Sequence, residues 1–447
     1  MSREKPSAAR KPARPAEAVP LGESLFAFAA GGWLGLSVVK FGNPVIFDQT
    51  ISAPSDLGGF VFFPWPVAWG YLLLAGVLCW AVRFARPVFN SGHWPIAAAG
   101  VWFFWQFISH GRSLDPRLSG PTLWHFGSCV LALLLGWWAL SRARNLRWFW
   151  IPVLIGFTYV LIGGFDQQHG GLESTRREFY KQDNWQMYPK EFLLKIQSER
   201  IFSTLVYPNA LAGLILLMLP ISLWKTWELT QPWPRVGRGV ALGMLAYLGA
   251  GCLFWTGSKG GWLVGMVMGL GLILHLGLPR RWKLAIITLS LALGLTVFFV
   301  RFSAYFQKGA TSVGARLDYW QAALQTAKEH PILGTGPGTF SAAYRKIKPP
   351  EAEMAKLTHN DYLEQASDSG LAGFVSFGAF VFGSMVILYR RRPAGDWTYF
   401  ILWLGLLGWT LQAFIEFGLY IPAIAWPAFL FIGLLWAKAE PAYFTKP

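Results

Sequence analysis

The chain has 447 residues, of which 54% are hydrophobic and 14% charged, whereas a soluble domain carries about 25% charged residues. Together with the 25 Trp and 35 Phe residues, this composition excludes a disordered chain, a fibrous chain and an ordinary cytosolic enzyme. Apolar stretches of about twenty residues recur along most of the length, which predicts an all-α, polytopic membrane protein.

About twelve transmembrane helices are expected. Residues 1–20, rich in Ala, Pro and basic residues, cannot bury a core and should form a disordered cytoplasmic tail. The first apolar segment is long and has no clear cleavage site, which favours a retained anchor over a signal peptide. The expected spans are 22–41, 61–82, 95–109, 121–140, 148–164, 203–224, 239–256, 261–278, 284–300, 371–389, 398–415 and 418–437.

The net charge of +16 follows the expected topology. With the N-terminus inside, the inner segments hold 21 of the 39 basic residues but only 6 of the 23 acidic ones. This asymmetry is what the positive-inside rule requires, so the basic balance indicates membrane orientation and not nucleic-acid binding. Both termini, including a tail at 438–447, are therefore expected in the cytoplasm.

Two long hydrophilic segments then fall outside, in the periplasm. Residues 165–202 interrupt a bundle of about nine spans over 21–300, and residues 301–370 precede the last three spans at 371–437. The second segment is longer than a connector between packed helices needs to be. We therefore expect the chemistry of the protein in these outer segments.

The three cysteines give no sign of a metal site. Cys79, Cys129 and Cys252 lie inside or at the edge of apolar segments, without CxxC or His/Cys spacing. We expect three buried thiols and no disulfide framework.

A helix is expected over 311–330 in the second outer segment, because apolar residues recur at helical spacing and Pro331 ends the pattern. Arg316 lies in its first turn, where the helix dipole disfavours a cation, so it needs an anionic partner. That partner is either a nearby acid, such as Asp318, or a bound phosphate.

The glycine-rich stretch Gly334-Thr-Gly-Pro-Gly338 follows this helix. Glycines allow positive φ and expose backbone N–H groups that can bind an oxyanion. No Lys-Ser/Thr pair follows, which argues against an ATP-binding loop. The stretch is thus either a plain turn or an anion-binding loop.

A second short helix is expected over 358–370, with Thr358 as its N-cap and Gly370 as its C-terminal stop. His359 would be the first helical residue, where the positive helix end keeps imidazole neutral and able to accept a proton. A lone His is more often structural or exposed, but this one lies at an end that attracts anions.

Three further polar residues belong to the outer segments or their borders. Arg200 precedes an apolar run in which Asn209 suggests a broken helix facing the bundle interior; its alternative role is to reach the membrane interface. Lys259 lies in the Gly-rich turn 256–261, where it either points a charge at the mouth of the bundle or is simply solvated.

Four stretches together resemble the O-antigen ligase family, a bacterial group that includes related polysaccharide polymerases and protein oligosaccharyltransferases. They are Tyr207-Pro-Asn-Ala-Leu-Ala212, Thr256-Gly-Ser-Lys-Gly-Gly261, Arg316 to Gly338 with Trp320, and His359-Asn-Asp-Tyr-Leu363 followed by Ser369-Gly-Leu-Ala-Gly373. Each is short and degenerate, but they occur in the order of the family and on the expected outer face.

The resemblance implies an inverting, metal-independent glycosyltransferase without a cofactor. Its donor would be a glycan on undecaprenyl diphosphate and its acceptor a hydroxyl at the periplasmic face of the bacterial inner membrane, with lipid A-core as the expected acceptor. Its partners would be this donor, this acceptor and the lipid bilayer, and no nucleic acid.

The resemblance also assigns roles to individual residues. His359 would be the general base, and Arg316 would hold the diphosphate. Lys259 falls where the family often has Arg and lacks the bidentate fork of that side chain. Arg200 is a further candidate for diphosphate binding.

Possible supporting residues are less well defined. Glu364, Asp361 or Asp368 could orient the imidazole of His359, and the sequence does not choose among them. Glu416, near the end of a span, would bind sugar hydroxyls or pair with an outer cation. The supporting candidates are Asn209, Asn360, Asp361, Tyr362, Glu364, Asp368 and Glu416.

Three alternatives remain at the level of the sequence. The protein could be a polysaccharide polymerase or a protein oligosaccharyltransferase of the same family, because acceptor choice depends on loop shape. It could be a transporter of the lipid-linked glycan, although such proteins keep ionisable residues near the membrane midplane and often repeat their halves. It could also be a structural membrane protein without catalysis.

Overall fold

The computed structural model describes residues 20–84, 94–181, 193, 197–205, 207–307, 311–350 and 352–439. Most of the expected tails 1–20 and 438–447, and part of the segment 165–202, lie outside these residues. Each of the twelve expected spans coincides largely with a helix, and the described residues contain no strand. These helices are α1 (Leu21–Lys40), α3 (Val67–Phe84), α4 (Trp94–His110), α5 (Pro116–Leu134), α6 (Arg147–Asp166), α9 (Pro208–Leu229), α10 (Arg235–Trp255), α11 (Lys259–His275), α12 (Arg280–Gln307), α15 (Asp361–Arg390), α16 (Trp397–Gln412) and α17 (Pro422–Lys438).

Within the described residues, seven helical stretches are long and apolar enough to cross a membrane, and three shorter helices are also apolar. The seven include α1 and α9, and the three shorter ones are α3, α11 and α17. The fold is therefore that of an all-α, polytopic membrane protein, as the composition predicts.

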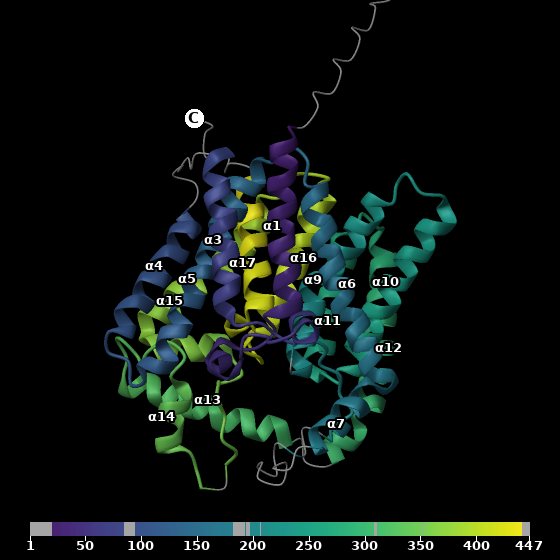
Figure 1. The fold of residues 1–447 in the computed structure, drawn as a ribbon. Coiled ribbons are helices and arrows are strands. Elements are labelled where there is room, and N and C mark those ends of the chain that lie inside the picture. Colours follow the sequence, from purple (N-terminus) through teal and green to yellow (C-terminus); the bar gives the residue numbers. More distant parts are fainter. Residues whose placement is uncertain are drawn as a thin grey trace, which may run out of the picture.

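The short elements lie between these helices. They are η1 (Val45–Thr50), α2 (Leu57–Phe62), η2 (Leu135–Ala139), η3 (Leu140–Arg142), η4 (Gln167–Gly171), α7 (Leu172–Tyr180), α13 (Thr311–Glu329), α14 (Phe340–Ile347) and η6 (Gly418–Tyr420). Figure 1 shows α7, α13 and α14 together at one end of the bundle, opposite the start of α1 and the end of α17. The described parts of the two segments that the sequence places outside thus lie at the same end of the bundle.

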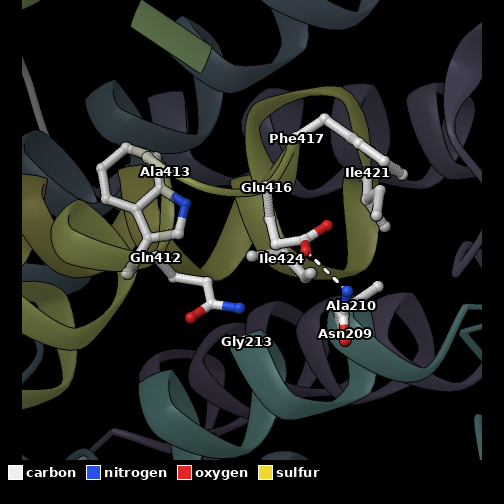
Figure 2. A pocket seen from close by; sticks show the side chains of 11 residues that line it. Asn209, Ala210, Gly213, Gln412, Ala413, Glu416, Phe417, Ile421 and Ile424 are labelled. Carbon is white, nitrogen blue, oxygen red and sulfur yellow. Dashed lines mark hydrogen bonds between the residues drawn. The ribbon is translucent and has the colours of Figure 1, made fainter. Parts of the chain in front are cut away.

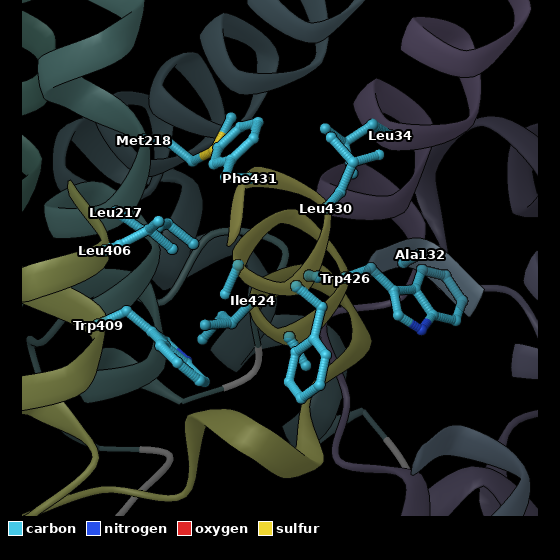
Figure 3. Packing of buried hydrophobic residues seen from close by; sticks show 14 of the residues in the cluster. Leu34, Ala132, Leu217, Met218, Leu406, Trp409, Ile424, Trp426, Leu430 and Phe431 are labelled. Carbon is cyan, nitrogen blue, oxygen red and sulfur yellow. The ribbon is translucent and has the colours of Figure 1, made fainter. Parts of the chain in front are cut away.

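Helix α17 forms the centre of the bundle. Nearly all its residues are buried, and apolar residues occupy every side of the helix. This is the pattern of a helix surrounded by others. Figure 3 shows Trp426, Leu430 and Phe431 of α17 among side chains from α1, α9 and α16. The backbone N–H of Ala423 donates to the carbonyl of Phe41 at the end of α1, which ties the two helices together.

Helices α1 and α6 pack through glycines. A Cβ atom at Gly31 would lie 2.1 Å from the carbonyl oxygen of Phe149, and one at Gly156 would lie 2.2 Å from that of Gly35. Contacts this short leave no room for a side chain. The helices therefore approach as closely as small residues allow, which is a common way for helices to associate in a membrane.

The expectation of three buried thiols is wrong for one of them. Cys129 and Cys252 are buried, whereas Cys79 is exposed. Cys79 lies on α3 at helical spacing from Leu72 and Val82, which are 71% and 63% exposed. This face of α3 points away from the bundle, where lipid would cover it.

Helix α13 confirms the helix expected over 311–330 and carries a small core of its own. Tyr319 and Ala323 are buried against Phe340 and Tyr344 of α14. The aromatic rings of Phe340 and Tyr344 stack at 5.3 Å between centroids. These contacts hold α13 across the end of the bundle, where its Arg316 faces the last spans.

Candidate active site

His359 lies in a tight turn just before α15. Its φ is +53°, a left-handed conformation that is uncommon for a residue with a side chain. The helix begins at Asp361, and the side chain of Asn360 accepts hydrogen bonds from the N–H groups of Tyr362 and Leu363. Asn360, and not Thr358, is thus the N-cap, and His359 precedes the helix.

Gly370 was expected to end the helix, but it only changes the direction of the helix. Its φ is +67°, and a kink occurs there, but helix continues beyond it to Arg390. The first part of α15 thus turns relative to the span that follows. The glycine breaks the helix direction without ending the element.

Glu416 is the centre of the site. Its side chain is 6% exposed, and one carboxylate oxygen accepts from Arg316 Nη2 at 2.5 Å and from Asn209 Nδ2 at 2.6 Å. The other oxygen lies 3.1 Å from Nδ1 of His359. Residues from α9, α13, the His359 turn and the α16–α17 connection therefore meet at one carboxylate.

The charges around Glu416 keep it ionised. Burial alone would raise the pKa of this carboxyl, but His359, Arg316 and the hydrogen bond from Asn209 hold its pKa below the usual value. An ionised carboxylate can only accept hydrogen bonds. Nδ1 of His359 is therefore the donor in this contact, and Nε2 is the ring nitrogen that does not face Glu416.

The three acids expected to orient His359 bind elsewhere, so that expectation is wrong. Asp361 accepts from the N–H of Leu419 at 3.0 Å, and Glu364 accepts from the N–H of Thr358 at 2.9 Å. They are turned into the bundle, since α15 starts after His359 and presents its first acids to the buried side.

Asp368 has a separate role, which settles the alternatives for the glycine-rich stretch. The N–H of Gly338 donates to the Asp368 carboxylate at 2.6 Å, and the N–H of Gly336 donates to the Asp368 carbonyl at 2.8 Å. The φ values of Gly334, Gly336 and Gly338 are all positive. The loop thus surrounds an internal carboxylate and forms a structural turn.

Tyr362 also has a structural contact. Its hydroxyl donates to the carbonyl of Thr410 in α16 at 3.0 Å. Together with the capping contacts of Asn360, this bond fixes the start of α15. The proposed supporting residues near His359 therefore hold its turn in place, while Glu416 contacts the imidazole itself.

One side-chain donor of Arg316 bonds none of the described residues. Its Nε and the indole Nε1 of Trp320 are buried, and neither has a hydrogen-bond partner among the described residues. The two residues are four positions apart on α13 and so share a face. Because a buried donor without a partner costs about 1–3 kcal/mol, these two N–H groups favour an anionic ligand beside Glu416.

Arg200 joins the same network through Asn209. Its Nη2 donates to Asn209 Oδ1 at 2.5 Å, and its Nε donates to the carbonyl of Thr256 at 2.6 Å. Asn209 faces the bundle interior as expected, but α9 is not broken there. It begins at Pro208, whose fixed φ suits the first helical position.

Lys259 lies at the border of this network. It is the first residue of α11, after the N-cap Ser258, and its ammonium is 3.8 Å from the ring centroid of Tyr305. It is close enough to Arg200 and Arg316 for their charges to act on it. The three expected cations thus gather on one face, although Lys259 has no direct bond to Glu416.

Aromatic rings enclose the imidazole of His359. The ring centroids of Phe417, Tyr207 and Tyr319 lie 4.8, 5.8 and 6.0 Å from that of His359. The side chain of His359 is 19% exposed, so one edge remains open. In the sequence, only the presence of Tyr207 and Tyr319 near expected site residues points to this enclosure.

A small cavity of about 10 Å³ lies behind Glu416. Figure 2 shows Gln412 on the same side as Glu416 and Asn209, with the amide of Gln412 pointing between α16 and α9. Both polar atoms of that amide, and Nε1 of Trp409, are buried without a partner among the described residues. The volume suits a single water molecule, which would satisfy these groups.

One segment of the chain is similar to a known protein family. Residues 244–378 match the family model described as O-antigen ligase. This segment contains Lys259, Arg316 and His359, whereas Arg200, Asn209 and Glu416 lie outside it.

A curated relative is an uncharacterised protein of Haemophilus influenzae. It is 34% identical over an alignment that covers 27% of this chain and 36% of the relative. The chain thus spans about a third of the length of that relative. The match over residues 244–378 supports membership of the O-antigen ligase family.

Proposed function

We propose that this protein is an inverting glycosyltransferase that moves a glycan from undecaprenyl diphosphate to an acceptor hydroxyl at the periplasmic face of the bacterial inner membrane. The carboxylate of Glu416 carries the proposal, because it bonds both His359 and Arg316. A base and a phosphate-binding cation thereby lie side by side. The description of the matching family favours lipid A-core as the acceptor.

In the proposed reaction, Nε2 of His359 takes the proton of the acceptor hydroxyl. The acceptor oxygen attacks the anomeric carbon as the bond from that carbon to the diphosphate oxygen breaks. Attack opposite the leaving group inverts the configuration. The products are the glycosylated acceptor, undecaprenyl diphosphate and an imidazolium that the Glu416 carboxylate stabilises.

The cations supply the electrostatic part of this mechanism. Negative charge grows on the leaving diphosphate, and Arg316, Arg200 and Lys259 would stabilise it, which is commonly the largest contribution in such transfers. Nε of Arg316 and Nε1 of Trp320 are donors available for the phosphate oxygens. The glycosyl diphosphate carries the energy of the reaction, so the proposal requires neither a metal ion nor a cofactor.

The test is transfer by the purified protein in lipid, with an undecaprenyl-diphosphate glycan and separate acceptors. We expect His359→Ala to lower the rate about 10²- to 10⁴-fold, as loss of a general base does. Arg316→Ala should lower it about 10²- to 10³-fold, as loss of a charge-stabilising donor does. Product on lipid A-core, on a longer lipid-linked glycan or on a protein would distinguish a ligase from a polymerase and a protein oligosaccharyltransferase.

The matched controls lie on the same loop helix or just after it. His330 and Lys328 are exposed and apart from the Glu416 network, so His330→Ala and Lys328→Ala should leave transfer unchanged. Near-normal transfer by both His359→Ala and Arg316→Ala would show that these roles are wrong.

A further inference from the structure

A second cavity lies at the other end of the bundle from Glu416. It has a volume of about 310 Å³ and is lined by residues of α6, α9, α16, α17 and the segment before α6. On α9, Asn209 belongs to the Glu416 network and Lys225 lines this cavity. Sixteen residues of helix separate them by about 24 Å, so the two sites are distinct.

The cavity is rich in cations. Arg144, Lys225 and Lys438 line it, against one acid, Asp396. The carboxylate of Asp396 caps α16 by accepting from the N–H of Tyr399 at 2.9 Å. Arg144 also forms an ion pair with Glu23 at 3.9 Å.

Two hydrogen-bond donors in the cavity wall, on Lys225 and Trp150, have protons without a partner among the described residues. The buried Lys225 ammonium donates to Glu228 at 2.5 Å and to Thr398 at 3.1 Å, so the hydrogen bonds within the described residues occupy two of its three protons. Trp150 is 3% exposed, and its Nε1 has no partner among the described residues. A buried indole N–H beside a lysine favours an oxygen-bearing anion.

The rest of the wall is apolar. Leu402, Leu434 and Leu435 line the cavity beside the cations. A free inorganic anion would gain nothing from these side chains, whereas an amphipathic ligand could place its polar group on the cations and its hydrocarbon on the leucines. The wall therefore favours a ligand that carries both an anionic group and a hydrocarbon chain.

We propose that this cavity binds the phosphate head group of an anionic glycerophospholipid, with its acyl chain against the leucines. A glycerol head group would also offer hydroxyl donors to Asp396, which suits phosphatidylglycerol. The charge distribution of the sequence predicts that this end faces the cytoplasm, where basic pockets between helices commonly bind anionic lipids. This site is independent of the proposed transferase reaction.

The experiment compares lipid binding by the full-length protein and by Arg144→Gln/Lys438→Gln in phosphatidylcholine nanodiscs. Native mass spectrometry and thermal unfolding would follow titration with phosphatidylglycerol. At about 1 kcal/mol for each cation near the membrane surface, the double variant should bind about 30-fold more weakly. Phosphatidylglycerol should raise the unfolding midpoint of the wild type and raise that of the variant much less.

The control is Arg280→Gln/Arg281→Gln, which removes two cations at the start of α12 without touching the cavity. It should bind phosphatidylglycerol like the wild type. Equal loss of binding by the two double variants would overturn the proposal, because general surface charge would then explain the effect. Equal stabilisation by inorganic phosphate would overturn the assignment to a lipid.

Discussion

At the scale of single residues, Glu416 determines what its neighbours can do. The sequence marked it as an acid near the end of a span that would bind sugar hydroxyls or pair with an outer cation, without indicating which cation. Its partners Asn209, Arg316 and His359 lie 207, 100 and 57 positions away in the chain, and no spacing rule connects such distances. Only the folded bundle brings these residues together.

Glu416→Gln tests the orientation of the imidazole. The amide can donate to Nδ1 of His359 and would then favour the tautomer with its proton on Nε2, where no base remains. We expect the transfer rate to fall at least about 10²-fold, with a smaller change in the apparent affinity for the donor. Steady-state kinetics with the reconstituted protein measure both; a lower affinity with an unchanged maximal rate would contradict the orienting role.

The same carboxylate makes stability depend on pH. Because the pKa of Glu416 is lower in the folded state than in the unfolded chain, the folded state binds this proton less readily. Its contribution to stability is present above the unfolded pKa of about 4.3 and is lost as the pH falls through the folded pKa. Thermal unfolding in detergent should therefore show a weaker acid dependence for Glu416→Gln than for the wild type.

At the scale of elements, the sequence predicted the helices better than their ends. Hydropathy locates spans reliably because a chain in lipid must satisfy its backbone hydrogen bonds within each helix. The cap of α15 depends instead on which of two neighbouring polar side chains reaches the free N–H groups, and Asn360 does so. The glycine-rich loop likewise owes its conformation to Asp368, which is distant in sequence.

Gly334→Ala tests that loop. Gly334 has φ +64°, and an added Cβ would lie 2.3 Å from the backbone carbon of Asp368. Strain and the clash with backbone should cost at least about 2 kcal/mol, seen as a lower unfolding midpoint in detergent. The control is Gly314→Ala in α13, where a Cβ meets nothing within 4 Å and helix propensity favours alanine by up to about 1 kcal/mol.

At the scale of the whole molecule, the candidate site and the basic cavity lie at opposite ends of the helix bundle. The residues around Glu416 gather at the end with α7, α13 and α14, and the basic cavity lies at the end where α1 starts and α17 finishes (Figure 1). The start of α1 and the end of α17 lie at the same end of the bundle (Figure 1). The charge asymmetry predicts that this side is the cytoplasm.

Cysteine labelling of intact cells tests this orientation. In a Cys79→Ser background, the two remaining cysteines are buried, so added ones report alone. Gln168→Cys, on the side of the candidate site, should react with a membrane-impermeant maleimide. Gly277→Cys, in the connection between α11 and α12, should react only after the membrane is permeabilised. The reverse pattern would invert the topology.

The position of Glu416 at the junction of four chain segments also constrains how this protein can change over evolutionary time. One side chain balances the charge of Arg316 and fixes the ring of His359. A lineage that replaced it would have to find two substitutes simultaneously, one for each neighbour. Under the proposed reaction, the residue that binds the donor and the residue that accepts the proton would therefore be inherited together.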